Sequence, residues 1–223
     1  MWQKTKKFTK TQIKKILNFI LNVNTLKGKE RRGWKIHKIK NSETTAEHIF
    51  SLTFAVWALG KNEKIDLNRA IKMALIHDIC EVYAPDFTSY DAAAIDEKKE
   101  ISPKDLLKLK PKPTRPTIEQ RKKLEKVKKK LEEEAMRKLI SGLPLNLKKE
   151  IKELWEEYEK QLTKESHFVK QLDKVINYFQ GMQYWKKYGR LKHKLWAARI
   201  KEVIDNPNII KLVDEFEKEI FEN

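Results

Sequence analysis

The sequence predicts an all-α protein, and two observations support this. Glycine is scarce, with 6 among 223 residues. Apolar residues recur at three- and four-residue spacing through nearly the whole chain, which is typical of helices with one apolar face. The length fits one large domain or two small ones and allows a substantial core.

Capping signals mark where the first two helices begin. Thr9 with Gln12, and Thr44 with Glu47, each match a capping box, in which two side chains bond otherwise unpaired backbone N–H groups. The first helix continues with one apolar face. We expect the second to run to about Gly60, which is suited to a C-terminal cap.

The sequence of the central part of the chain predicts a third helix followed by a long loop. Asp66 can cap a helix that passes through Ile79. Residues 86–117 break the helical pattern with four prolines, and one helical turn is expected there, at Pro103 after the natural cap Ser102. Loops of this length are often lids or binding loops, or are simply mobile.

The remainder of the chain is predicted to be helical. Thr117 and Gln120 open a charged helix that ends near Gly142. Further helices are expected over residues 147–161, 164–188, 191–205 and 207–221.

The formal net charge of +17 points to anionic partners, but its pattern favours another interpretation. Lysine supplies most of the charge, with only eight arginines, and it is interleaved with glutamate, as where Lys128–Lys130 is followed by Glu132–Glu134. Bidentate recognition of bases and phosphates favours arginine. We therefore interpret the charge as solvated helix faces, and nucleic acid is not an expected partner.

The expected cellular compartment is inferred from disulfides, membrane spans and signal peptides. Cys80 is the single cysteine, so no intrachain disulfide can form and a reducing compartment is allowed. No run of about 18 apolar residues exists, so no membrane span is expected. The first 24 residues are basic but lack a continuous apolar stretch and a cleavage site, so no signal peptide is expected. A cytoplasmic protein is the expectation.

Four potential metal ligands lie at the edges of the predicted apolar faces. His77 and Asp78 are adjacent near the end of the third helix, and His48 and Asp173 each lie within a turn of buried positions. A buried carboxylate without a partner is costly, and a metal, or Lys174 beside Asp173, would resolve that cost. Imidazole and carboxylate together suit a divalent metal such as Mn, Fe, Co, Ni or Zn, which makes a nucleophile from bound water.

Glu81 is the candidate for general acid–base work. On a helix, its place four residues after His77 and three after Asp78 puts the three side chains together. The alternatives are a surface glutamate at a helix C-terminus and, for His77, a satisfied core histidine.

Four strings follow one another along the chain: Arg32-Gly33-Trp34, ETTAEH at 43–48, ALIHDICE at 74–81 and VKQLDK at 169–174. They resemble the HD-domain metal-dependent phosphohydrolases, and within them the 5′-deoxynucleotidase branch. The segment LWEEYE at 154–159 also resembles that branch. The resemblance covers roughly Asn22 to Tyr184.

The resemblance implies a compact all-α HD-type bundle. Residues 1–223 would form one domain, with a motif core of about 22–184 and the helices of 191–222 packed on it. One divalent metal would be bound, with Mn, Co, Fe, Ni, Mg and Zn all open. Its ligands would be His48, His77, Asp78 and Asp173.

The resemblance also implies roles for residues around the metal. Glu81 and Asp86 would be the catalytic carboxylates. Arg32 would hold the substrate phosphate, and Trp34 would help to define the sugar pocket. Pro85 precedes Asp86 where the family usually has glycine. Structural alternatives are a solvated basic stretch for Arg32 and a core aromatic for Trp34.

The activity that follows is hydrolysis of nucleoside 5′-monophosphates, with a preference for deoxyribose, to nucleoside and phosphate. A homodimer is expected by the same resemblance. Two alternatives stay open. One is an HD phosphohydrolase acting on another nucleotide or small phosphoester, and the other is a basic nucleic-acid-binding helical protein with a vestigial metal site.

Overall fold

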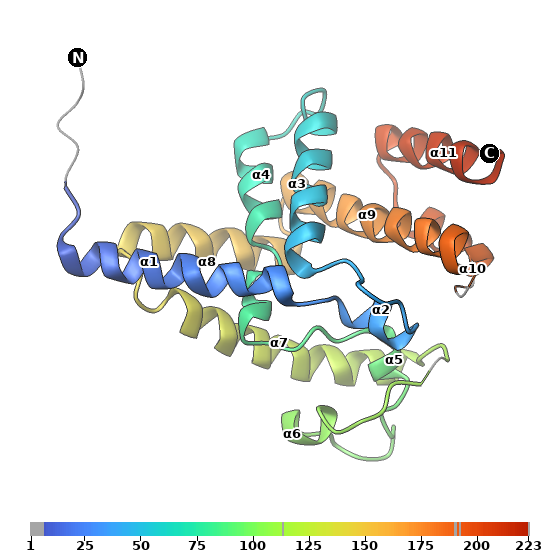
Figure 1. Ribbon diagram of the computed structural model, residues 1–223, viewed down its shortest axis with the longest axis horizontal. Coiled ribbons are helices and arrows are strands. Elements are labelled where there is room, and N and C mark those ends of the chain that lie inside the picture. Colours follow the sequence, from blue (N-terminus) through green and yellow to red (C-terminus); the bar gives the residue numbers. More distant parts are fainter. Residues whose placement is uncertain (1–6, 113, 190, 192, 223) are drawn as a thin grey trace. The chain divides into compact units, whose positions relative to one another are not determined.

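The computed structural model describes residues 7–112, 114–189, 191 and 193–222, without the side chains of 193–195 and 222. Its secondary structure is helical, and no β-strand occurs in the described ranges (Figure 1). The all-α prediction is confirmed. Within the same ranges, no helix combines the length and apolar character needed to cross a membrane.

The chain divides into two compact units, each built from two stretches of sequence. Unit 1 comprises Met1–Gly33 and Ile79–Lys152, and unit 2 comprises Trp34–Asp78 and Glu153–Asn223.

Unit 2 is organised around its longest helix, α9 (Lys164–Tyr188). Helices α3 (Thr45–Gly60) and α4 (Leu67–Ile76) pack on each other and on α9, as can be followed in Figure 1. Helices α10 (His193–Val203) and α11 (Pro207–Glu222) also pack on α9. The buried apolar core includes Leu52, Val56, Met73, Val169, Leu172 and Val175. This core holds α3, α4 and α9 in fixed positions.

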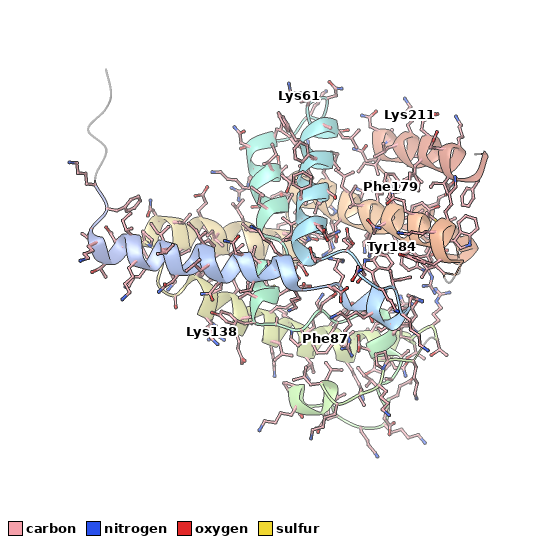
Figure 2. The ribbon with its side chains drawn as sticks, in the orientation of Figure 1. Lys61, Phe87, Lys138, Phe179, Tyr184 and Lys211 are labelled. Carbon is pink, nitrogen blue, oxygen red and sulfur yellow. The ribbon has the colours of Figure 1, made fainter. Side chains whose placement is uncertain are left out.

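Unit 1 is organised around α7 (Ile118–Ile140). This helix contacts the 3-10 helix η2 (Ile79–Val82), α1 (Lys10–Asn24), α5 (Ser89–Ala92) and α6 (Pro103–Leu106). A smaller apolar core contains Phe87, labelled in Figure 2, together with Ile95, Leu106, Leu124 and Val127. It joins the 86–117 segment to α7.

Three elements remain. The 3-10 helix η1 (Thr25–Gly28) follows α1 within unit 1. Helices α2 (Arg32–Ile36) and α8 (Leu145–Lys160) each contain residues of both units, because the division falls inside them.

The predicted N-terminal caps are formed. Thr9, Thr44 and Thr117 each make a capping box at the start of α1, α3 and α7. The Asp66 side chain accepts a backbone N–H at the start of α4, and Ser102 does the same for α6. The last four helices begin and end within two residues of the predicted bounds.

The third helix ends earlier than predicted. The prediction carried it through Ile79, whereas α4 stops with His77 as its C-cap. The His77 ring donates its Nδ1–H to the carbonyl of Ala74 at 2.8 Å. A continuing α-helix would use that carbonyl for the backbone N–H of Asp78, so the ring competes with the next helical bond. The chain proceeds as η2, which carries Glu81.

Gly60 does not serve as the predicted cap. It is the last residue of α3, and Lys61 takes the C-cap position. The φ angle of Gly60 is not positive. A Cβ atom at Gly60 would lie 2.7 Å from Leu67 Cδ1, so the glycine allows close approach of the next helix.

Residues 86–117 contain more structure than predicted. The expected turn is confirmed as α6, but α5 was missed. Thr88 and Asp91 make a capping box at the start of α5. Gln120 of α7 donates to two backbone carbonyls of this segment, at 2.8 and 3.4 Å.

Positive charge is divided unevenly between the units. The two stretches of unit 1 contain 29 Lys and Arg against 14 Asp and Glu, whereas those of unit 2 contain 20 against 18. The interleaving seen in the sequence does produce pairs, such as Lys128 with Glu132 on α7. Nearly all of the net charge nevertheless belongs to unit 1.

Candidate metal centre

Three of the four predicted ligands meet in unit 2. His48 comes from α3, His77 from the end of α4 and Asp173 from α9, and one ligand atom of each lies within 4.8 Å of the others. Oδ1 of Asp173 is 3.0 Å from Nε2 of His48 and 4.0 Å from Nε2 of His77. Both histidines are buried. Three helices distant in sequence thus direct their donor atoms at one point.

Asp78 lies at the edge of this group. Its Oδ2 is 3.0 Å from Nε2 of His77, but Asp78 is not among the three residues whose ligand atoms all lie close together. Its side chain is 24 % exposed, against 1 % for His77. Asp78 therefore lies on the more solvent-accessible side of the group, beside His77.

The protonation of His77 tests whether a cation fits here. Its Nδ1 must carry a hydrogen, because it faces the carbonyl oxygen of Ala74. In the neutral ring Nε2 then presents a lone pair, and this buried atom makes no hydrogen bond. Carboxylate oxygens of Asp78 and Asp173 face it at 3.0 and 4.0 Å. Acceptors facing one another are unfavourable unless a second proton or a metal ion lies among them, so the donor set fits a divalent metal.

Asp173 is ionised and can act as an anionic ligand. Burial raises its pKa, but the hydrogen bond from His48, with the charge of Lys170 nearby, outweighs this and holds the pKa well below its usual range. The Tyr158 hydroxyl donates to Asp173 Oδ2 at 3.0 Å. Burial, with the nearby charge of Asp173, raises the pKa of Tyr158 well above its usual range, so the hydroxyl keeps its proton.

Glu43 lies behind His48. Its Oε1 is 3.7 Å from Nδ1 of His48, and its Oε2 accepts the indole N–H of Trp34 at 3.0 Å. The backbone N–H of Glu43 donates to the hydroxyl of Tyr184, which Figure 2 labels on α9, at 2.7 Å. A carboxylate behind a ligating histidine is a common way of fixing the ring orientation.

Trp34 is a buried aromatic of unit 2. It is 2 % exposed, and its ring packs edge-on against Tyr184 at 5.1 Å and stacks on Trp196 at 5.7 Å. The indole is linked to His48 of the metal group through Glu43. A contact of Trp34 with a sugar stays a prediction.

Arg32 lies in unit 1 and is bound by a carboxylate that the sequence analysis missed. Its Nε lies 3.0 and 3.1 Å from the two carboxylate oxygens of Asp91, and its Nη2 lies 2.6 Å from Oδ1. Asp91 is fully buried, whereas the Arg32 side chain is 35 % exposed. The guanidinium is therefore fixed from its buried side.

The two predicted catalytic carboxylates also belong to unit 1. Asp86 Oδ2 accepts the backbone N–H of Arg32 at 2.8 Å. Glu81 is buried on η2, where the Lys29 ammonium donates to the carbonyls of Glu81 and Ala84. The segment that carries Glu81 and Asp86 is thus bound to the Lys29 side chain through backbone carbonyls and to the Arg32 backbone through the Asp86 side chain.

Comparison with known proteins identifies the family of this helical architecture. A family model described as an HD domain matches residues 23–209. The chain belongs to the HD domain family. The 5′-deoxynucleotidase HDDC2 of Bos taurus is 32% identical to this HD-domain chain over 208 residues, which cover 92% of the chain and 85% of the relative. The human protein of the same name is 29% identical over 211 residues, with the same coverage.

Solved structures show the same HD-domain fold. A predicted metal-dependent phosphohydrolase from Magnetospirillum magnetotacticum matches with a TM-score of 0.61 and 20% identity, covering 96% of this chain and 97% of that one. A protein from Pyrococcus horikoshii matches with a TM-score of 0.62 and 23% identity, covering 91% and 96%. At these identities the likeness concerns the fold.

Three residues of the HD-domain chain were missed as functional candidates: Glu43, Asp91 and Tyr158. Each contacts a predicted site residue directly: Glu43 faces His48, Asp91 binds Arg32, and Tyr158 binds Asp173. Signals were present for all three, since Glu43 and Tyr158 lie in strings that carry the family resemblance and Thr88 with Asp91 matches a capping box. Nothing in those strings showed what the side chains would touch.

Proposed function

We propose that this HD-domain chain is a metal-dependent phosphohydrolase that converts deoxynucleoside 5′-monophosphates to nucleosides and phosphate. The substrate class is supported by relatives named 5′-deoxynucleotidase that are 29% and 32% identical over nine-tenths of the chain. The observation that carries the proposal is Nε2 of His77, a buried lone pair facing two carboxylates. That arrangement favours a cation bound among ligands from three helices.

In this proposal His48, His77, Asp78 and Asp173 hold one divalent ion. Such an ion, when bound, polarises a phosphoryl oxygen and lowers the pKa of a water molecule. A mixture of imidazole and carboxylate ligands suits several metals, and we propose Mn or Co ahead of Zn for activity in vitro.

Four further residues carry the remaining roles in this proposal. Glu81 takes a proton from the water whose oxygen attacks phosphorus. Arg32 binds the phosphate oxygens with its guanidinium and neutralises part of their charge. As the bond from phosphorus to the 5′ oxygen breaks, Asp86 delivers a proton to that oxygen, directly or through water. Trp34 would limit the space beside the sugar.

A substrate screen tests the proposal. Metal-free protein would be supplied with Mn²⁺, Co²⁺, Mg²⁺ or Zn²⁺, and phosphate release would be measured from deoxynucleoside and ribonucleoside monophosphates, a deoxynucleoside triphosphate and a simple phosphomonoester. We expect the deoxynucleoside monophosphates to be the best substrates, with His77→Ala as the inactive control. Turnover confined to the other compounds would favour a different HD phosphohydrolase.

A second candidate function rests on the charge of unit 1, which has 29 basic against 14 acidic residues. Such an excess could bind the backbone of nucleic acid. Titration of a labelled duplex at increasing salt would separate the two functions, because a steep loss of affinity with salt, together with no phosphate release from any nucleotide, would favour the binder.

We also propose the number of domains, the oligomeric state and the cellular location of the protein. The family match at residues 23–209 runs through both units, which supports one HD-type domain. We propose a homodimer and a cytoplasmic location on the family resemblance. Light scattering on the purified protein tests the first, and fractionation of the source cells tests the second.

A further inference from the structure

Asp91 has no exposed surface and accepts hydrogen bonds at both oxygens. Nε and Nη2 of Arg32 approach it from one side. The backbone N–H and hydroxyl of Thr88 donate to Oδ2 at 2.8 and 2.9 Å. The buried carboxylate is therefore fully bonded, and release of Arg32 would leave a charge without a partner, which is strongly unfavourable.

The hydrogen bonds to Asp91 use one particular edge of the guanidinium. Nε and Nη2 face the carboxylate, so Nη1 and the second hydrogen of Nη2 are not used in the pair. These remaining donors form the end-on edge of the Arg32 side chain, which is 35 % exposed. The end-on fork matches two oxygens of a phosphate group.

We propose that Asp91 is a positioning residue that fixes Arg32 side-on so that its end-on edge binds the phosphate of a monophosphate ester. The inference rests on the proposed function. Asp91 does not touch the substrate. It fixes the rotation of the guanidinium, so the entropy of ordering that side chain is lost on folding and not on substrate binding.

The inference gives a result different from that of a purely structural ion pair. Charge-assisted hydrogen bonds contribute about 1.5–3 kcal/mol, which corresponds to about a 10- to 150-fold change in binding. Asp91→Asn keeps the shape and removes the charge. We expect it to raise KM for a deoxynucleoside monophosphate by about 10-fold or more, with kcat within a few-fold and metal affinity unchanged.

A matched control separates positioning from loss of local structure. Thr88 bonds the same carboxylate and caps α5, but it does not contact Arg32 through any hydrogen bond in the described residues. Thr88→Val should lower the thermal midpoint while KM stays near the wild-type value. An equal rise of KM in Thr88→Val and Asp91→Asn would mean that loss of α5, not positioning, is responsible.

The decisive experiment is a double-mutant cycle on the metal-loaded protein, with kcat, KM and inhibition by inorganic phosphate measured for each variant. Asp91→Asn should have little further effect on KM in an Arg32→Ala background, because the residue acts through Arg32. Additive effects would overturn the inference. If Asp91→Asn fails to fold, Arg32→Lys replaces it. Lysine has no planar guanidinium, so it cannot bind Asp91 with one edge and the phosphate with another. A wild-type KM for Arg32→Lys would then overturn the inference.

The outcomes distinguish this inference from the proposed function. Turnover by the wild type, a raised KM in Arg32→Ala and an unchanged KM in Asp91→Asn would overturn the positioning role alone. Absence of turnover by the wild type with every metal and monophosphate would overturn the proposed function and this inference with it.

Discussion

The hydroxyl of Tyr158 donates a hydrogen bond to Oδ2 of Asp173 at 3.0 Å, while the other oxygen of the same carboxylate faces His48 at 3.0 Å. Tyr158 is 1 % exposed, and its ring also packs edge-on against His77 at 5.3 Å. A residue outside the ligand set therefore fixes the orientation of one ligand and packs against a second.

Removal of this hydroxyl should weaken metal binding. Tyr158→Phe leaves Oδ2 of Asp173 without its donor, and loss of such a supporting contact typically lowers metal affinity by about 10- to 100-fold. Tyr178→Phe is a matched control, since Tyr178 is also buried and its hydroxyl donates to Glu217 at 2.8 Å, away from the ligands. Titration of metal-free protein with Co²⁺ measures both variants. Equal affinities for the two would show that Tyr158 does not support the metal centre.

Substitution of Glu81 should lower turnover and leave the metal content unchanged. Glu81→Gln retains the size of the side chain but removes the base, so we expect kcat to fall by about 10²- to 10⁴-fold. Metal content by elemental analysis should match that of the wild type, because Glu81 is not in the proposed ligand set. Unchanged turnover would exclude Glu81 as the general base, and loss of the metal would make it a ligand.

The ion pair between the buried Glu157 and the exposed Arg69 should make stability depend on acid pH. The hydrogen bond from Arg69, which outweighs burial, lowers the pKa of Glu157. A lowered folded-state pKa means that the stabilisation is present above the ordinary glutamate pKa, about 4.3, and is lost as the pH falls further.

Glu157→Gln tests this dependence. At neutral pH we expect the variant to lose about 0.5–1.5 kcal/mol of unfolding free energy, since a charge-assisted bond is removed but solvent screens the 42 % exposed Arg69. The difference from the wild type should shrink as the pH falls below about 4.3. Denaturant unfolding at several pH values measures this, and a difference that is constant with pH would contradict the predicted ionisation.

Gly181 should tolerate no side chain. A Cβ atom there would lie 2.6 and 2.8 Å from two ring carbons of Trp196, which is closer than van der Waals contact allows. Gly181→Ala should therefore cost about 1–3 kcal/mol in unfolding free energy through overpacking between α9 and α10. At Gly28 a Cβ would meet nothing within 4 Å, so Gly28→Ala is the control. Equal thermal midpoints for the two would contradict this packing.

Much of the fold could be predicted because its signals are local. Capping boxes at Thr9, Thr44 and Thr117 depend on residues three positions apart, and the structure forms all three. The end of the third helix could not be predicted in this way. It depends on a ring nitrogen of His77 competing for the carbonyl of Ala74, which requires a particular rotamer.

The candidate site likewise has parts that the sequence predicted and parts that it could not. The convergence of His48, His77 and Asp173 was predicted from apolar periodicity and family resemblance, and the structure brings the three together. The bond from Arg32 to Asp91 spans 59 positions of sequence, and nothing in the pattern around either residue indicated it. Contacts of this kind follow from tertiary packing.

Metal binding by the wild type, Asp173→Asn and His77→Ala tests the central claim most directly. Metal-free preparations of the three proteins would be titrated with Co²⁺ and Mn²⁺, and bound metal would be measured by elemental analysis, with circular dichroism as the check on folding. We expect one ion per wild-type chain and loss of the ion in both variants while they stay folded. Failure of the wild type to bind a divalent ion, or full occupancy in both variants, would contradict the assignment of this centre.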